Sequence, residues 1–485
     1  MHGRSGNRPQ RRGCRVHRQA PQYALRGARR SSLPGNRCSA DDRAGHGQRR
    51  RRRTHSSRVE SVRSEKPRRQ AAARHPELTR YHASWVVPIS RPPFRNGWVG
   101  VKAGRVAALG RRGEERAGDD EVGLGNVAIL PGLTNAHTHL ELSFLRGRIP
   151  PADAFVDWIR GVVASRGRVG DPSAPEILAG IEEGIAEAIR CGTALVGDIS
   201  NTLIPFERLK RSELAGVVFH ELIRFNAPDP EAFVEQAMGR LEALGVAERV
   251  RASLAPHAPY SVAPLVFRAI RKALDRLPSL PTSVHLCESP EEMEFIASGT
   301  GAWREFLDEM GAWSPSWVPP GTSPVQYLDD DGFLDERVMA IHGVQMQLDD
   351  LARLATRGTT LVTCPRSNAR TGAGSPPLED FYASGVRVAV GTDSLASTPD
   401  LNVFAELAAM RALAPSVPAS DLLDSATRQG ARALGFDADY GTIDVGKTAR
   451  LLAVDVPAAV ADVEEYLVSG IQPEQLRWID ACSSD

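Results

Sequence analysis

Apolar and polar positions alternate regularly along most of the chain, from about residue 80 onward. Apolar runs of four to six residues are followed by longer stretches in which apolar residues recur at helical spacing. Such alternation predicts buried parallel strands connected by amphipathic helices. The eight predicted strands are 127–130, 194–197, 216–219, 250–255, 282–285, 338–342, 360–363 and 387–391. Predicted helices include 175–190, 230–244, 264–276, 349–356 and 401–414.

Eight strand–helix units predict an α/β protein with a (β/α)8 TIM-type barrel over residues 127–436. Both flanks of this region carry short predicted strands, at 81–87, 98–102, 106–109 and 449–454. We expect residues 79–126 and 437–485 to form one small β-sandwich domain from the two chain ends. The segment 299–327, with three tryptophans and several prolines, is predicted to be an insertion or lid after the fifth barrel strand.

Residues 1–78 have a different composition from the rest. They contain 22 Lys and Arg against five Asp and Glu, a net charge of +17, which leaves −16 for residues 79–485. With little apolar periodicity, this Arg-rich extension is predicted to be disordered. A nucleic-acid-binding tail is one interpretation. We favour an adventitious extension, such as a start site placed too early, and expect no nucleic-acid partner.

The six cysteines are scattered and none forms a C-x-x-C pair, which argues against a disulfide framework and fits a reducing compartment. The sequence has no apolar run of about 18 residues and no apolar core of a secretory signal near its start. We therefore predict a cytoplasmic protein that does not bind membranes.

Two histidines follow the first predicted strand with one residue between them. Residues i and i+2 of an extended backbone point to the same face, so His137 and His139 can reach one ion from one strand end. A strand that happens to end in polar residues would look the same. The choice between these interpretations depends on whether other strands supply further ligands.

Other predicted strands do end in suitable residues, at the carboxyl ends where barrel active sites are built. His285 ends strand five and Glu288 follows it, His342 ends strand six and Asp393 follows strand eight. Three histidines and a carboxylate suit zinc, with ferrous iron as the alternative. The predicted ligands of one divalent ion are His137, His139, His285 and Asp393. Such an ion lowers the pKa of a bound water from ~15.7 toward ~7.

Two residues beside these ligands are candidates for proton transfer. Glu288 lies three residues past His285, close enough to exchange a proton beside the ion, and His342 is the second candidate. The structural alternatives are a helix N-terminal charge for Glu288 and a satisfied buried imidazole for His342. His220, at the end of strand three, could line the pocket, but we expect it to be a buried structural residue.

Six segments together resemble the amidohydrolase superfamily over residues 79–456. These segments are NAHTHLE (135–141), APHAPY (255–260), HLCE (285–288), IHG (341–343), CPRSN (364–368) and GTDSLAS (391–397). They are similar to the mononuclear cytosine-, guanine- and adenosine-type deaminases and chlorohydrolases, and within that branch they look more like aminodeoxyfutalosine deaminases than methylthioadenosine/adenosylhomocysteine deaminases. The long basic extension and Arg450, where relatives usually have an acidic residue, depart from the pattern.

The resemblance implies hydrolytic displacement at a ring carbon, most simply deamination of an aminopurine nucleoside. Glu288 would shuttle a proton to a ring nitrogen, while His342 and Asp393 would orient and deprotonate water. Substrate contacts are expected at His257, Ser397 and Glu141. Binuclear relatives bridge their ions with a lysine or glutamate on a middle strand. No lysine outside residues 1–78 ends a predicted barrel strand, so one ion is expected.

Two alternatives remain open. Within the same class, the enzyme could displace chloride or open a cyclic amide, because pocket shape decides the leaving group. From a different class, an inactive barrel could carry a nucleic-acid-binding tail, although every proposed catalytic residue is present. The expected partner is a small molecule with an amino-bearing heterocycle. Relatives are often dimers, so a homodimer is an open expectation.

Overall fold

The computed structural model describes residues 78–114 and 120–479. The predicted Arg-rich extension therefore lies outside the described residues, apart from Leu78 at its end. Among the residues described, no helix has the length and apolar character needed to cross a membrane.

Eight parallel strands form an α/β, TIM-barrel-like fold. They pair as two four-stranded sheets, β6-β7-β8-β9 and β10-β11-β12-β13. Backbone hydrogen bonds join the edges: His285 N–H donates to His257 O at 2.8 Å, and Thr392 and Asp393 N–H both donate to His137 O. The strands are β6 (Leu133–Thr138), β7 (Thr193–Ser200), β8 (Ala215–Leu222), β9 (Val250–Pro256), β10 (Thr282–Leu286), β11 (Val338–His342), β12 (Thr360–Thr363) and β13 (Arg387–Val390). The predicted barrel architecture is confirmed at this level.

The helices between these strands agree closely with the sequence pattern. The five predicted helices are α2 (Pro175–Arg190), α4 (Pro230–Ala243), α5 (Pro264–Leu274), α9 (Leu348–Arg357) and α12 (Val403–Leu413). Three of them begin with proline, which suits the first helical position because its fixed φ is helical and its missing N–H needs no partner there. Proline therefore marks the point where the chain leaves a strand and turns back along the barrel wall.

The first barrel strand was predicted wrongly. Residues 127–130 belong to β5 (Val127–Pro131), which pairs with strands from the chain ends, and the barrel begins at β6. One apolar run thus supplies two sheets, divided at Gly132. A Cβ on Gly132 would lie 2.6 Å from the Ala194 Cβ, so only glycine fits where the chain crosses from one sheet to the other. Continuous apolarity could not reveal that division.

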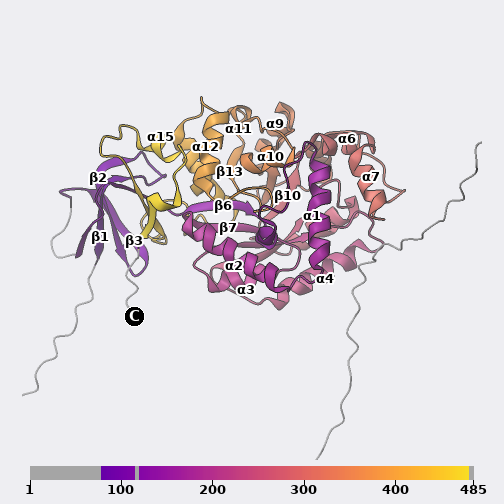
Figure 1. Ribbon diagram of the computed structural model, residues 1–485, viewed down its shortest axis with the longest axis horizontal. Helices are drawn as coiled ribbons and strands as arrows, with labels where there is room; N and C mark the ends of the chain where they lie inside the picture. The colour runs from indigo at the N-terminus through magenta and orange to yellow at the C-terminus, as the bar shows by residue number, and fades with distance from the viewer. Residues whose placement is uncertain (1–77, 115–119, 480–485) are drawn as a thin grey trace, which may run out of the picture. The chain divides into compact units, whose positions relative to one another are not determined.

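A seven-stranded sheet contains strands from both ends of the described chain, in the order β15-β14-β5-β1-β2-β3, with β4 paired to β1. Figure 1 shows the yellow C-terminal segment beside the indigo strands β1, β2 and β3. The other strands are β1 (Thr79–Val86), β2 (Phe94–Lys102), β3 (Arg105–Arg111), β4 (Asp120–Gly123), β14 (Leu451–Asp455) and β15 (Leu476–Ile479). The pairing of the two chain ends agrees with the prediction, while the sandwich form stays a prediction.

The interior of the barrel is filled by side chains. Alternate residues of the strands point inward and pack into one buried cluster, as expected for a small barrel. Members of this cluster include Ala136, Leu195, Val217, Phe219, Ile341, Val362 and Ala389. Because the lumen is packed, polar chemistry is confined to the mouth, where the strands end.

The connection between β10 and β11 carries extra helices, in the region predicted to be an insertion. They are α6 (Pro290–Ser298), α7 (Ala302–Glu309) and α8 (Pro324–Asp330). Trp303 on α7 stacks on Tyr260, which follows β9, with ring centroids 3.8 Å apart. The insertion thereby packs against the mouth of the barrel and contributes to the wall of the cavity there.

A candidate metal and acid–base centre at the mouth of the barrel

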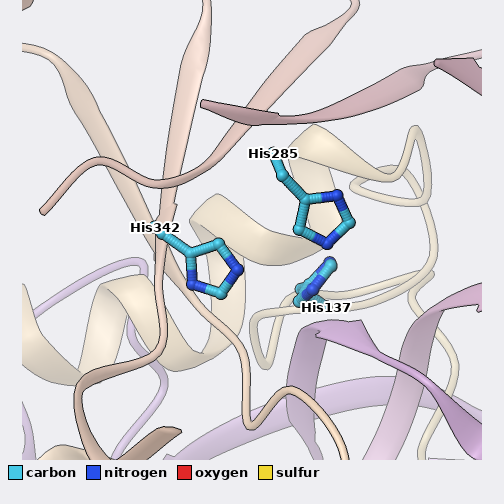
Figure 2. Close-up of side chains that lie close together, drawn as sticks. All are labelled: His137, His285 and His342. Carbon is cyan, nitrogen blue, oxygen red and sulfur yellow. The ribbon is translucent and has the colours of Figure 1, made fainter. Parts of the chain in front are cut away.

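The four predicted metal ligands converge at the carboxyl ends of three strands. His137 lies on β6, His139 follows it, His285 lies on β10 and Asp393 follows β13. Asp393 Oδ1 lies 3.8 Å from His137 Nε2 and 3.5 Å from His139 Nε2, and His139 Nε2 lies 3.4 Å from His285 Nε2. Figure 2 shows the imidazoles of His137, His285 and His342 facing one another. Ligating atoms this close together can surround a single ion.

Neighbouring groups orient these ligands for a cation. His285 Nδ1 lies 3.0 Å from His257 O, and since a carbonyl oxygen only accepts, Nδ1 carries the proton and Nε2 keeps its lone pair. Asp393 Oδ2 accepts hydrogen bonds from the hydroxyls of Ser367 and Ser397, which leaves Oδ1 facing the histidines. The buried His137 ring has no hydrogen-bond partner at either nitrogen among the described residues. The donor set fits a zinc-like ion, which would satisfy Nε2 of His137.

Burial also gives these side chains suitable protonation states. It lowers the pKa of His139 and His285 to about 4, and that of His137 well below the usual value for histidine. The imidazoles are therefore neutral at pH 7 and their lone pairs are available to an ion. Burial raises the pKa of Asp393, and its hydrogen bonds from the two serines oppose that rise.

Glu288 and His342 form a buried pair beside the ligands. Glu288 Oε1 lies 3.3 Å from His342 Nε2, and each side chain is less than 5% exposed. Burial, with added repulsion from Asp393 and Glu292, raises the pKa of Glu288 well above its ordinary value. A carboxyl group whose pKa is raised holds its proton more tightly, which suits a general acid. The Asn368 amide lies 3.0 Å from His342 Nδ1 and holds the ring in place.

The backbone is strained where the strands meet the centre. Cys287, His342 and Asp393 have φ values of 52°, 76° and 59°, in the left-handed region that residues other than glycine rarely adopt. Such strain persists only where the surroundings hold it. At Cys287 the support is visible, because the Glu292 carboxylate accepts the N–H groups of both Cys287 and Glu288.

The centre opens into a cavity of about 670 Å³. Its polar end contains His139, His285, Glu288, His342 and Asp393. Its walls are mostly apolar and come largely from α1 (Phe155–Val169) and from the α7 region. Polar catalytic groups at one end of an apolar cleft are typical of an enzyme site for a small organic substrate.

The predicted substrate contacts have different outcomes. His257 lines the cavity, whereas Glu141 and Ser397 are not among the described residues that line it. Glu141 Oε1 accepts hydrogen bonds from Ser200 Oγ at 2.8 Å and from the backbone N–H of Thr202 at 3.1 Å. With this local role for Glu141, and with Ser397 bound to Asp393, their positions give no support to direct substrate contact.

A buried carboxylate in the cavity was missed in the sequence. Glu221 lies on β8 beside His220, is 7% exposed and lines the cavity. Its Oε1 lies 3.8 Å from His285 Nδ1. The signal was present, because Glu221 also falls near the end of a predicted strand, and successive strand residues face opposite ways. His220 is buried, and its Nδ1 lies 3.3 Å from Ser200 O, while its Nε2 has no hydrogen-bond partner among the described residues. Its structural role stays a prediction.

Comparison with known proteins agrees with this geometry. The amidohydrolase family model matches residues 128–472. The chain is 29% identical to the 5-methylthioadenosine/S-adenosylhomocysteine deaminase of Nitratidesulfovibrio vulgaris, over 76% of this chain and 81% of that protein. It is 32% identical to the aminodeoxyfutalosine deaminase of Deinococcus radiodurans, over 70% and 81%.

Solved structures show the same fold. An adenosine deaminase from Xanthomonas campestris with bound zinc superimposes with a TM-score of 0.70 at 26% identity, covering 82% of this chain and 90% of that one. The atrazine chlorohydrolase of Arthrobacter aurescens, with zinc, has a TM-score of 0.67 at 18% identity over 80% and 91%, a likeness of fold alone.

A barrel mouth with three histidines, an aspartate and a buried acid defines the class as a barrel hydrolase built around a metal-binding centre. The chain belongs to the amidohydrolase family. It is an enzyme that hydrolyses carbon–nitrogen bonds, and the resemblance predicted from the sequence motifs is confirmed.

Proposed function

We propose that the enzyme deaminates an aminopurine nucleoside. Water replaces the exocyclic amine on a ring carbon, and the products are the oxo-purine nucleoside and ammonia. The observation that carries the proposal is the buried Glu288 beside four convergent ligands at the polar end of an apolar cavity. Named relatives are deaminases of aminopurine nucleosides, which supports the same reaction class.

The chain's own residues divide the proton transfers between them. Asp393 and His342 orient the attacking water, and one of them accepts its proton. Glu288, whose pKa burial raises, donates to the ring nitrogen next to the reacting carbon and so draws electrons out of the ring. The amine then takes up the proton that Asp393 or His342 accepted from water and leaves as neutral ammonia, while the new hydroxyl on the ring carbon returns a proton to Glu288 and becomes the oxo group.

We propose one zinc ion, held by His137, His139, His285 and Asp393, with ferrous iron as the alternative. Such an ion would supply Lewis acidity that brings the pKa of water toward ~7. The zinc-containing structure of a relative supports zinc. No lysine ends a barrel strand in the part of the chain that the structure describes, which supports a single ion.

Aminodeoxyfutalosine is our first candidate substrate, since the relative of that name is among the more similar at 32% identity. We further propose the predicted domain division with one change: an extension at 1–78, a barrel at 127–436 whose first strand is β6, and a β-sandwich domain from 79–126 and 437–485 to which β5 adds a strand. A cytoplasmic location is supported by Cys191, Cys287 and Cys364, which are free and buried.

Metal analysis of the purified protein combined with a substrate panel tests the function. The panel holds adenosine, 5-methylthioadenosine, S-adenosylhomocysteine, aminodeoxyfutalosine, guanine, cytosine and atrazine, assayed for ammonia and chloride. We expect one zinc per chain and ammonia from at least one aminopurine nucleoside. Chloride release from atrazine alone would favour the chlorohydrolase alternative. A chain lacking residues 1–77 should keep its activity, and a loss would count against our division of the chain.

A further inference from the structure

We propose that Glu221 and His257 together bind two neighbouring hydroxyl groups of the substrate's sugar. The inference rests on the proposed nucleoside deamination and adds a residue that determines specificity. It starts from two hydrogen-bond acceptors that face each other in the cavity: Glu221 Oε1 lies 4.0 Å from His257 Nε2. Both residues line the same cavity as Glu288.

Glu221 is fixed at one oxygen and unsatisfied at the other. Its Oε2 accepts a hydrogen bond from Asn201 Nδ2 at 2.8 Å, and Asn201 Oδ1 accepts one from Arg166 at 2.8 Å. These contacts set the orientation of the carboxylate. Its Oε1 is buried and has no hydrogen-bond partner among the described residues. A buried carboxylate oxygen without a donor is costly, so a ligand that donates to it gains affinity.

The neighbouring groups show which nitrogen of His257 is an acceptor. His257 Nδ1 lies 2.6 Å from Ser261 Oγ, and the Ser261 hydroxyl donates to Ala258 O at 3.2 Å. Since that hydroxyl proton is already used, Ser261 Oγ accepts from Nδ1–H. With Nδ1–H turned toward Ser261, Nε2 of His257 offers its lone pair on the side of the ring that faces Glu221.

Two acceptors at this separation require a ligand with two donors. A cis-diol presents two O–H groups from adjacent carbons, and one can point to each acceptor. A ribonucleoside carries such a diol, whereas its 2′-deoxy and 3′-deoxy analogues each lack one hydroxyl. A site built to bind a hydroxyl rejects the analogue that lacks it, because its buried acceptor is then left without a donor.

A second cation is the rival occupant of this position. Atoms of Glu221, His257 and His285 lie close enough together to hold an ion. The contributing atom of His285 would be Nδ1, which lies 3.8 Å from Glu221 Oε1. That nitrogen carries a proton, because it lies 3.0 Å from the carbonyl oxygen of His257. Only two donor atoms remain for a cation, so the pair suits hydroxyl groups better.

The test compares ribonucleosides with deoxynucleosides in wild type and in Glu221→Gln. Glutamine can keep its carbonyl oxygen on Asn201, and it then turns an N–H donor toward the cavity. We expect the wild type to prefer adenosine over 2′-deoxyadenosine or 3′-deoxyadenosine by roughly 10- to 100-fold in kcat/KM, the range for a hydrogen bond to a charged group. In E221Q this ratio should fall toward one. Glu231→Gln, at an exposed position on α4, serves as the matched control and should keep the preference.

Binding measurements separate this proposal from the proposed function. Calorimetry with inosine, 2′-deoxyinosine and 3′-deoxyinosine needs no turnover, so an enzyme that releases no ammonia still reports on Glu221. The proposal is supported if wild type binds one or both deoxy forms more weakly than inosine and if this difference in affinity disappears in E221Q. An unchanged ratio in E221Q, equal binding of all three nucleosides, or no binding of any overturns it. Loss of one metal equivalent in E221Q, with circular dichroism unchanged, would assign the position to a cation instead.

Discussion

At the scale of single residues, the proposed chemistry depends on a carboxyl group whose pKa burial raises. Glu288 is 3% exposed and its pKa is raised well above the ordinary range. Glutamine has nearly the same shape but cannot donate and regain a proton. Glu288→Gln should therefore lower kcat by at least ~100-fold, the lower end for general acid–base catalysis, while metal content stays at the wild-type level.

The control for this variant lies on the next helix. Glu294→Gln changes an exposed residue of α6 and should leave both kcat and metal content unchanged. Steady-state kinetics with the active nucleoside and elemental analysis of the same preparations make the comparison. Near-normal turnover of E288Q would remove Glu288 from the mechanism, and loss of metal in E288Q would show that the side chain acts as a ligand.

At the scale of an element, the turn between β10 and α6 positions Glu288. Glu292 accepts the N–H groups of Cys287 and Glu288 at 3.0 and 2.9 Å, one on each carboxylate oxygen. Glutamine offers only one acceptor, so Glu292→Gln should leave one buried N–H without a partner. We expect a loss of about 1–3 kcal/mol in the free energy of unfolding, measured by urea titration against E294Q, together with a lower kcat. Stability and kcat equal to those of E294Q would contradict this role.

The strands and turns also show which features of this protein can be predicted from its sequence and which cannot. Alternating apolar runs located most barrel strands, because a buried parallel strand needs apolar residues on both faces. The convergence of His137, His139, His285 and Asp393 could be predicted, since all four stand at strand ends. The division of one apolar run into β5 and β6 could not be predicted, because it depends on the tight packing at Gly132. Glu221 was missed although it stands near a predicted strand end, because its contacts with Asn201 and His257 join residues distant in sequence. The support from Glu292 was missed because it depends on the local backbone geometry of the turn.

At the scale of the whole molecule, folding buries many ionisable groups whose pKa values move in opposite directions. The pKa of His257 falls from 6.5 to about 4, so the folded state binds this proton less readily than the unfolded state does. Its contribution to stability is therefore lost as the pH falls from 6.5 toward 4. His257→Gln does not titrate, and the stability of wild type relative to this variant should decline across that window. Urea midpoints at constant metal content measure it, and a pH-independent difference would contradict it.

The buried carboxyl groups should show the opposite dependence, and Glu406 on α12 is the clearest case. Its Oε2 accepts the backbone N–H of Arg366 at 3.1 Å, and its side chain is fully buried. Burial raises its pKa from 4.5 to about 8, although the Arg366 guanidinium, 3.7 Å from Oε1, opposes that rise. The folded state therefore holds this proton more tightly than the unfolded state does. The resulting stability is fully present below pH 4.5 and is lost as the pH rises through 8.

Glu406→Gln keeps an acceptor for Arg366 and cannot ionise. Wild type should lose stability relative to this variant, on the order of a few kcal/mol, between pH 4.5 and 8. Urea titrations across that range measure this difference in the free energy of unfolding. If wild type instead becomes more stable relative to the variant as the pH rises, Glu406 is ionised in the folded protein.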